Sequence, residues 1–217
     1  MKFLRYWLTA LFVLMFMAAP LHAAQFIEGK QYLRLSTPQP TSDPSRIEVV
    51  ELFWYGCSHC FTLEPYIQQW LETKPNDVVF VRLPAIVGPG WELLAKAYYT
   101  AELLGVLDTM HPELFDAIHE KGQTIRDVDA LRDFFVSHGV SADDFNNTFN
   151  SFAVSVKINN AKLMTRRYAI TGVPTVIING QFSTGGRQAG SNANIIKVVD
   201  YLVEQERAGM SAVAKTP

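Results

Sequence analysis

Two cysteines separated by two residues are the side chains of this sequence whose type and spacing most directly indicate chemistry. They lie in the tetrapeptide Cys57-Ser58-His59-Cys60, and the chain contains no other cysteine. A disulfide that closes so short a loop removes little conformational entropy from the unfolded chain, so it would add little stability. We therefore interpret the pair as a reactive dithiol, in which a thiolate attacks or leaves during disulfide exchange.

The segments on either side of this tetrapeptide favour a thiolate at Cys57. Ile47–Tyr55 is a nearly continuous apolar run that predicts a buried strand, and helical spacing begins at Ser58. Cys57 would then lie at a helix N-terminus, where unpaired N–H groups and the positive end of the helix dipole stabilise an anion. His59, when protonated or donating, would add to this effect, and Cys60, one turn further, would be the more buried, resolving sulfur. Stabilising the thiolate favours the reduced form, so the oxidised form would donate its disulfide.

One acidic residue lies inside the predicted buried strand. Glu51 stands between Val50 and Leu52. A carboxylate in such a place is costly and should have a raised pKa, which is a feature of functional sites. The alternative is that Glu51 lies at an exposed strand end and has no role in the chemistry.

The elements that must position these residues indicate an α/β fold. A second buried strand is expected at Val78–Leu83, which with the first strand and the helix forms a parallel, right-handed unit. Asn179-Gly180, between Thr175–Ile178 and Gln181–Ser183, predicts a hairpin that adds an antiparallel pair. A closing amphipathic helix is expected around Ile195, Val198, Val199 and Leu202.

Between these parts of the sheet, residues 88–162 show helical patterns only. The expected stripes are Trp91 to Ala101, Leu114 to Ile118, Val128 to Phe135, Phe145 to Phe149 and a long helix at about Phe152 to Tyr168. Ser141 and Asp144 resemble a capping box for the fourth of them. The sequence therefore predicts an all-helical insertion.

The first residues resemble a secretory signal peptide. Lys2 and Arg5 precede the apolar run Tyr6–Ala19, and small residues follow. As a helix the run would span about 21 Å, short of the roughly 30 Å of a membrane core. We expect residues 1–23 to be removed, with cleavage after Ala24 or an uncleaved anchor as alternatives. Export would place the two cysteines in an oxidising compartment.

Composition sets the remaining limits. The chain has 217 residues, 48% of them hydrophobic, which is enough for one well-packed domain. The formal net charge is −2 and no cluster of Lys and Arg is present, so the class of nucleic-acid-binding proteins is excluded.

Together these motifs resemble the DsbA family of thioredoxin-fold disulfide oxidases. The resemblance rests on the CXHC motif Cys57–Cys60, the preceding segment Glu51–Gly56, the helical insertion and the segment Thr171–Thr175, and it covers essentially the whole mature chain. It implies a thioredoxin-like fold made of residues 24–87 and 163–217, interrupted by the insertion 88–162. A low cysteine pKa and an oxidising potential are properties of that family.

The resemblance also implies an activity and partners. The expected function is a periplasmic dithiol oxidase that passes its Cys57–Cys60 disulfide to newly exported, reduced or unfolded proteins through a mixed disulfide on Cys57. A DsbB-type membrane quinone reductase would reoxidise it. We expect a monomer with no cofactor, no metal ion and no nucleic-acid partner.

Further site residues follow from the same resemblance. Pro174 matches a cis-proline opposite the cysteines, and Val173 before it would offer backbone hydrogen bonds to substrate. Glu51 matches a buried acid that helps move protons to and from Cys60. The chain departs from the commonest family motif at Ser58, where proline is usual, and this leaves the sign of the change in potential open.

Three alternative functions stay open at this stage. The first is a disulfide isomerase or reductase, although strand signals begin within about ten residues of Ala24 and leave no room for an N-terminal dimerisation domain. The second is a metal-binding protein that uses both cysteines and a histidine, although His111, His119 and His138 lack ligand spacing. The third is a peptide holdase, whose groove would be bordered by aromatic residues of the insertion such as Trp91, Tyr98 and Tyr99.

Overall fold

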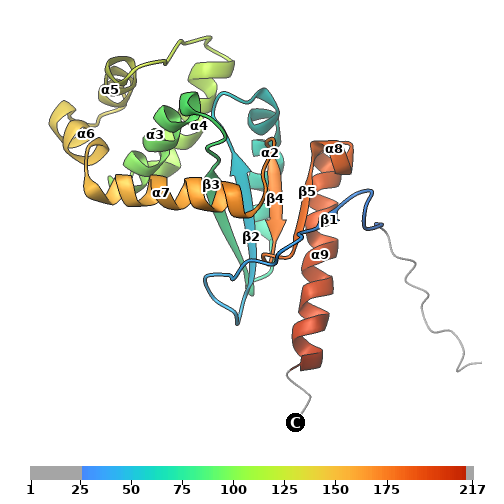
Figure 1. Cartoon of the computed structure of the whole chain (residues 1–217). Helices are drawn as coiled ribbons and strands as arrows, with labels where there is room; N and C mark the ends of the chain where they lie inside the picture. Colours follow the sequence, from blue (N-terminus) through green and yellow to red (C-terminus); the bar gives the residue numbers. More distant parts are fainter. Residues whose placement is uncertain (1–25, 214–217) are drawn as a thin grey trace, which may run out of the picture.

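The central element is a mixed five-stranded sheet, seen in a computed structural model that describes residues 26–213. Its strand order is β1-β5-β4-β2-β3, so strands far apart in the sequence lie side by side (Figure 1). The strands are β1 (Leu33–Arg34), β2 (Ile47–Phe53), β3 (Val78–Pro84), β4 (Thr175–Ile178) and β5 (Phe182–Gly185).

The predicted strand-helix-strand unit is confirmed. β2 and β3 pair in parallel, and α2 (Ser58–Thr73) connects them. Every residue of β2 is buried, as its continuous apolar run predicts for a strand covered on both faces. The strand ends at Phe53 rather than at Tyr55, because the Trp54 carbonyl accepts a hydrogen bond from the N–H of Cys57 and turns the chain.

The predicted hairpin is also confirmed. β4 pairs antiparallel with β5 and with β2, which places Val176 beside Glu51. Asn179 and Gly180 both have positive φ, at 50° and 62°, as expected for a tight hairpin turn. The hairpin brings the segment that precedes β4 to the end of β2, next to the cysteines.

The insertion consists of helices, as predicted. After the short 3₁₀ turn η1 (Pro89–Trp91), its helices are α3 (Glu92–Leu103), α4 (Leu107–His119), α5 (Val128–Ser137), α6 (Ala142–Phe149) and α7 (Phe152–Arg167). Ser141 caps α6 by accepting a hydrogen bond from the N–H of Asp144. The boundary expected at Lys162 falls inside α7, a continuous helix that runs from the insertion back to the sheet (Figure 1).

Two hydrophobic cores lie on opposite faces of the sheet. One joins β2 to the insertion and includes Leu52, Phe53, Phe115 and Phe135. The other lies beneath α2 and α9 (Asn192–Val213), with the four residues predicted for the closing helix all buried. The short helix α8 (Gly186–Ala189) precedes α9. Because the first core crosses from sheet to insertion, the insertion is packed onto the cysteine end of β2.

Most of the expected apolar stripes of the insertion face this core. Tyr98 and Tyr99 are buried in it rather than bordering an open groove. Val128 differs from expectation and is exposed, because it is the first residue of α5 and precedes the turn that packs. The expected signal peptide, residues 1–23, lies outside the described residues. Within residues 26–213, no helix combines the length and the apolar character needed to cross a bilayer.

Candidate active site

Cys57 and Cys60 lie at the start of α2, as predicted. Cys57 is the N-cap residue in extended conformation, and its carbonyl accepts hydrogen bonds from the N–H groups of Cys60 and Phe61. Cys57 is partly exposed, whereas Cys60 is fully buried. Both are free thiols in this structure, which therefore represents the reduced form. One sulfur is accessible to a protein substrate and the other is not.

The surroundings of Cys57 favour its thiolate. A hydrogen bond from the Cys60 thiol lowers the pKa of Cys57 to about 6, and the backbone N–H groups of Cys60 and His59 add to this effect. The charge of His59 contributes in the same direction, as expected from the sequence, but it is the weakest of these contributions. At neutral pH the exposed sulfur is therefore mostly ionised.

Cys60 behaves in the opposite way. Burial raises its pKa far above the usual range for a thiol, and the neighbouring thiol of Cys57 and the charge of Glu51 raise it further. Ionising Cys60 is therefore unfavourable unless a proton acceptor or a positive charge compensates. The two sulfurs are thus chemically distinct, with Cys57 suited to leave as an anion and Cys60 suited to hold a proton.

Glu51 is the fully buried carboxyl group that the sequence indicates, and the alternative of an exposed strand end is wrong. Burial raises the pKa of Glu51 to about 8, and the negative charge of Glu64 also raises it, while Arg82 opposes the shift. Arg82 Nε lies 3.4 Å from Glu51 Oε2, yet neither carboxyl oxygen has an aligned hydrogen-bond partner among the described residues. Glu51 is therefore largely protonated at neutral pH and can exchange a proton close to it.

Val173 and Pro174 lie opposite the cysteines and are joined by a cis peptide bond. The carbonyl oxygen of Val173 is 3.5 Å from Cys57 Sγ and can accept a hydrogen bond from the thiol. Beside them opens a groove of about 690 Å³, lined by His59, Val173, Pro174, the exposed Arg187 and Asn192 among others. The groove therefore runs along the segment whose Val173 carbonyl oxygen faces Cys57.

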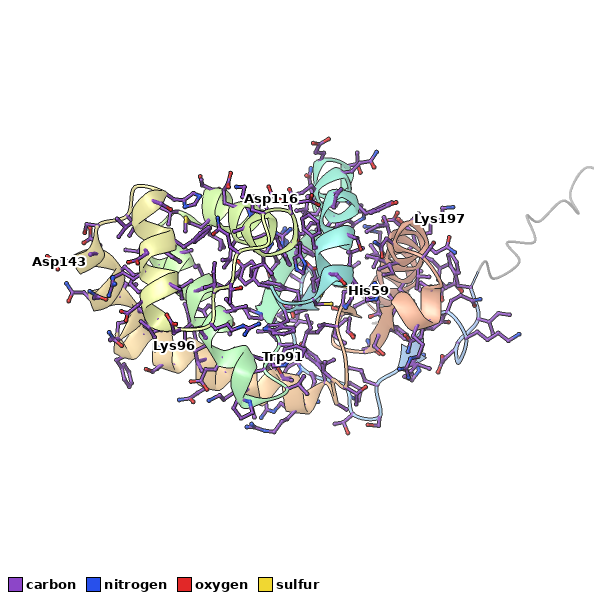
Figure 2. The ribbon with its side chains drawn as sticks, turned by 90° about the horizontal axis from the view of Figure 1, so that it is seen from above. His59, Trp91, Lys96, Asp116, Asp143 and Lys197 are labelled. Carbon is purple, nitrogen blue, oxygen red and sulfur yellow. The ribbon has the colours of Figure 1, made fainter. Side chains whose placement is uncertain are left out.

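His59 and Ser58 are both exposed at the start of α2. Figure 2, which looks down on the site from above, shows His59 between the insertion helices and α9. Ser58 makes no cap for the helix, because the N-cap position is taken by Cys57.

The sequence reasoning missed a buried network of charges below the cysteines. Arg82 Nη2 lies 2.9 Å from Glu64 Oε2, and His111 Nε2 lies 3.1 Å from Glu64 Oε1. Burial alone would raise the pKa of Glu64, but the hydrogen bonds and charges of His111 and Arg82 outweigh it and leave that pKa lowered. One signal was present in the sequence: Glu51 and Arg82 each interrupt an apolar run, and the two runs form neighbouring strands in which these residues are direct neighbours in register. The second of these strands, β3, was expected to be buried, but it is an edge strand and its middle residues are only partly buried.

A stacked tryptophan pair was also missed. The rings of Trp54 and Trp91 lie 4.4 Å apart and are tilted by only 17°. The Trp54 ring covers Gly56, where an added Cβ would come within 2.4 Å of it. Figure 2 shows Trp91 at the edge of the insertion that faces the site. The pair thus joins η1 to the turn that carries Cys57.

The histidines and cysteines within residues 26–213 do not gather into a metal site. Among the residues that the structure describes, no group of three or more His, Cys, Asp or Glu side chains is arranged to hold a metal ion. His111 and His119 instead make hydrogen bonds to protein groups.

Comparisons with known proteins agree with this geometry. The family described as DSBA-like thioredoxin domain matches residues 77–192. The thiol:disulfide interchange protein DsbA of Pseudomonas aeruginosa is 42% identical over 186 residues, covering 86% of this chain and 88% of that protein. DsbA of Azotobacter vinelandii is 40% identical over 200 residues, covering 92% of this chain and 94% of that protein.

Solved structures that resemble this chain are also DsbA proteins. The crystal structure of Pseudomonas aeruginosa DsbA superimposes with a TM-score of 0.83 at 41% identity, covering 87% of this chain and 98% of that one. The oxidoreductase DsbA from Xylella fastidiosa gives a TM-score of 0.78 at 33% identity, covering 84% of this chain and 98% of that one. With its thioredoxin fold, its paired cysteines and these relatives, the chain belongs to the DsbA family of thiol:disulfide oxidoreductases.

Proposed function

We propose that this protein is a periplasmic dithiol oxidase that donates the Cys57–Cys60 disulfide to newly exported proteins. The observation that carries the proposal is that the two thiols differ in acidity. The pKa of the accessible Cys57 is lowered, and the pKa of the buried Cys60 is strongly raised. A stabilised thiolate makes the reduced form favourable and hence the disulfide a strong oxidant.

The reaction begins with the oxidised form. A thiolate of the substrate attacks Cys57 Sγ, the Cys57–Cys60 bond breaks, and its electron pair leaves on Cys60 as the mixed disulfide forms. A second substrate thiolate then attacks the substrate sulfur of the mixed disulfide and releases Cys57 as a thiolate. Two electrons pass from the substrate dithiol to the protein dithiol, and the substrate leaves with a disulfide.

The remaining site residues have supporting roles in this proposal. Glu51 supplies the proton that Cys60 takes when it becomes a leaving group, because its pKa of about 8 allows proton exchange near neutral pH. The backbone of Val173, held before Pro174, pairs with the substrate peptide. His59 and the backbone N–H groups at the start of α2 stabilise the Cys57 thiolate.

The cellular setting is part of the same proposal. Residues 1–23 direct export and are removed, and the mature chain acts as a monomer in the periplasm on reduced or unfolded proteins. A DsbB-type membrane quinone reductase accepts the two electrons and restores the disulfide. Residues 24–87 and 163–217 form the thioredoxin-like domain, and the insertion 88–162 covers one side of the site.

The test uses the oxidised mature protein and a reduced, unfolded substrate that contains two cysteines. We expect stoichiometric oxidation of the substrate by the unaltered protein, and complete loss of activity in Cys57→Ser and in Cys60→Ala, because neither variant can form the Cys57–Cys60 disulfide. A reduction potential close to that of thioredoxin would contradict the proposal. Efficient rescue of a scrambled substrate without added oxidant would instead favour an isomerase, and substrate protection that survives Cys57→Ser would favour a holdase.

A further inference from the structure

Helix α4 of the insertion carries two histidines that both contact Tyr55. The Tyr55 hydroxyl lies 2.7 Å from His111 Nδ1, and His119 Nε2 lies 2.7 Å from the Tyr55 carbonyl oxygen. Tyr55 is fully buried and stands two residues before Cys57. The insertion therefore holds the segment that leads into the cysteine motif by both its side chain and its backbone.

The second nitrogen of His111 reaches the other side of the motif. His111 Nε2 lies 3.1 Å from Oε1 of Glu64, which is in α2, seven residues after Cys57. Glu64 accepts two hydrogen bonds from Arg82, so it is a carboxylate and can only accept. Nε2 of His111 must therefore carry the proton, which leaves Nδ1 to accept from the Tyr55 hydroxyl.

This assignment agrees with the surroundings of the imidazole. His111 is 4% exposed and packs edge-on against the rings of Phe53, Tyr98 and Phe115. The charged groups that face it are Glu64 and Arg82. Burial lowers the pKa of His111, in spite of the nearby Glu64 carboxylate, so the ring is neutral at physiological pH. A neutral imidazole with both nitrogens engaged is a fixed bridge between two segments.

We propose that His111 is a positioning residue for the redox centre, because it joins Tyr55 before the cysteine motif to Glu64 after it and holds the start of α2 against the end of β2. His119 provides the second attachment of Tyr55 to the same helix. The inference rests on the proposed function, since the geometry that it maintains is the one that stabilises the Cys57 thiolate.

The physical link is the orientation of the helix start. The thiolate of Cys57 is stabilised by hydrogen bonds from Cys60 and from the first N–H groups of α2, and such bonds weaken steeply with distance and misalignment. If α2 can shift relative to Tyr55, these bonds lengthen in the reduced form. The oxidised form contains no thiolate, so the same shift of α2 destabilises the reduced form only. The equilibrium between the two redox forms then moves toward the oxidised form.

The experiment compares four variants of the full mature chain with the unaltered protein. His111→Leu removes both hydrogen bonds, Tyr55→Phe removes only the hydroxyl, and His111→Gln offers an amide that can accept from Tyr55 and donate to Glu64. His138→Leu is the matched control, because His138 also belongs to the insertion but bonds only within its own helix end and to Glu113. The readouts are thiolate absorbance against pH, the redox equilibrium with glutathione, and the free energy of unfolding of both redox forms.

We expect His111→Leu to raise the pKa of Cys57 by half a unit or more, which corresponds to about a threefold loss in the equilibrium constant for reduction by glutathione. Tyr55→Phe should shift both quantities in the same direction, and His111→Gln should restore most of the loss. His138→Leu should leave both unchanged. A purely structural role would lower the stability of both redox forms equally and move neither quantity.

The inference is overturned if Tyr55→Phe and His111→Leu keep the Cys57 pKa and the glutathione equilibrium of the unaltered protein. Should His111→Leu not fold, Tyr55→Phe decides alone, since it keeps the buried ring. The unaltered protein separates the two proposals: an ordinary thiol pKa there contradicts the proposed function, whereas an acidic thiol that the variants leave unchanged contradicts only the role of His111.

Discussion

Cys57 and Cys60 have the same side chain and lie one helical turn apart, yet the pKa of Cys57 is lowered and the pKa of Cys60 is raised. The difference comes from place alone: Cys57 is at the open N-terminus of α2, where N–H groups point at it, and Cys60 is under the helix beside a buried acid. A hydrogen bond from Cys60 makes the largest contribution to the lowered pKa of Cys57. The pair is therefore a single unit, in which the buried thiol stabilises the exposed anion.

This dependence can be tested by changing Cys60 only. Cys60→Ala removes the donor, so the pKa of Cys57 should rise from about 6 toward the usual range, while Cys60→Ser keeps a hydroxyl donor and should retain much of the shift. Thiolate absorbance against pH measures both variants. If the pKa of Cys57 stays at about 6 in both variants, the helix N-terminus rather than the neighbouring thiol is responsible.

Glu51 lowers stability at neutral pH, because its pKa is raised to about 8 by burial. Between pH 4.5 and 8 the folded form holds a proton on Glu51 that the unfolded chain releases. The free energy of unfolding is therefore unaffected by this group below pH 4.5 and falls as the pH rises from 4.5 toward 8. Glu51→Gln should therefore raise the free energy of unfolding by about 3 kcal/mol at pH 7, with no gain below pH 4.

Urea unfolding at a series of pH values measures this gain. Glu48→Gln is the matched control, because Glu48 is in the same strand but accepts hydrogen bonds from the N–H and hydroxyl of Ser42. That substitution should bring no gain at any pH. A pH-independent effect of Glu51→Gln would mean that the carboxyl group is solvated in the folded protein.

At the scale of elements, the connection between β2 and α2 decides where Cys57 points. The connection is short, it turns through the hydrogen bond from Cys57 to Trp54, and two parts of the insertion contact it. Helix α4 contacts it through Tyr55, and η1 contacts it through the stack of Trp91 on Trp54. The insertion is thus part of the framework of the site as well as a cover over it.

Gly56 is the point in this connection that leaves no space for a side chain. A Cβ there would lie 2.4 Å from the Trp54 ring. Gly56→Ala should therefore displace Trp54 from Trp91, lower the free energy of unfolding by about 1–3 kcal/mol and slow substrate oxidation. Near-ultraviolet circular dichroism reports the tryptophan stack directly.

Gly90→Ala is the control for this substitution, because a Cβ at Gly90 of η1 would meet no atom within 4 Å. It should leave the dichroism, the stability and the oxidation rate close to those of the unaltered protein. An unchanged tryptophan signal in Gly56→Ala would contradict the close packing described for this turn.

At the scale of the whole molecule, the thiolate links redox state to stability. The pKa of Cys57 is lowered to about 6 in the folded reduced form, so its stabilising effect is present at high pH and is lost as the pH falls through 6. Allowing for the partial exposure of Cys57, this amounts to about 1 kcal/mol at pH 7. The short disulfide loop contributes to the stability of the oxidised form by an amount that does not change with pH.

The stability of the reduced protein relative to the oxidised protein should therefore fall by about 1 kcal/mol between pH 7 and pH 5. Urea unfolding of both redox forms, followed by tryptophan fluorescence and far-ultraviolet dichroism, measures it. The two probes should give one transition, because a single core joins the sheet to the insertion. A stability difference between the two redox forms that is the same at pH 7 and at pH 5 would contradict the ionisation assigned to Cys57.

The sequence was sufficient where the signal is local. The apolar run of β2, the helix that begins at Ser58, the Asn179-Gly180 turn and the Ser141 cap each depend on neighbouring residues, and all four are confirmed. The position of Cys57 at the helix N-terminus follows from the first two, so the order of residues along the chain is enough to place this cysteine at the start of α2.

Only the tertiary structure decided which distant residues surround the cysteines. His111 is 54 positions beyond Cys57, and in the sequence it resembles any other histidine of an amphipathic helix. Only the packing of α4 on β2 places the two imidazole nitrogens of His111 between Tyr55 and Glu64. Arg82 is likewise brought next to Glu51 by the pairing of β2 with β3, and it forms an ion pair with Glu64 of α2. Local patterns specify secondary structure because hydrogen bonding and burial repeat along the chain, but the ionisation of a buried group depends on charges brought close in space, and their positions are set by packing.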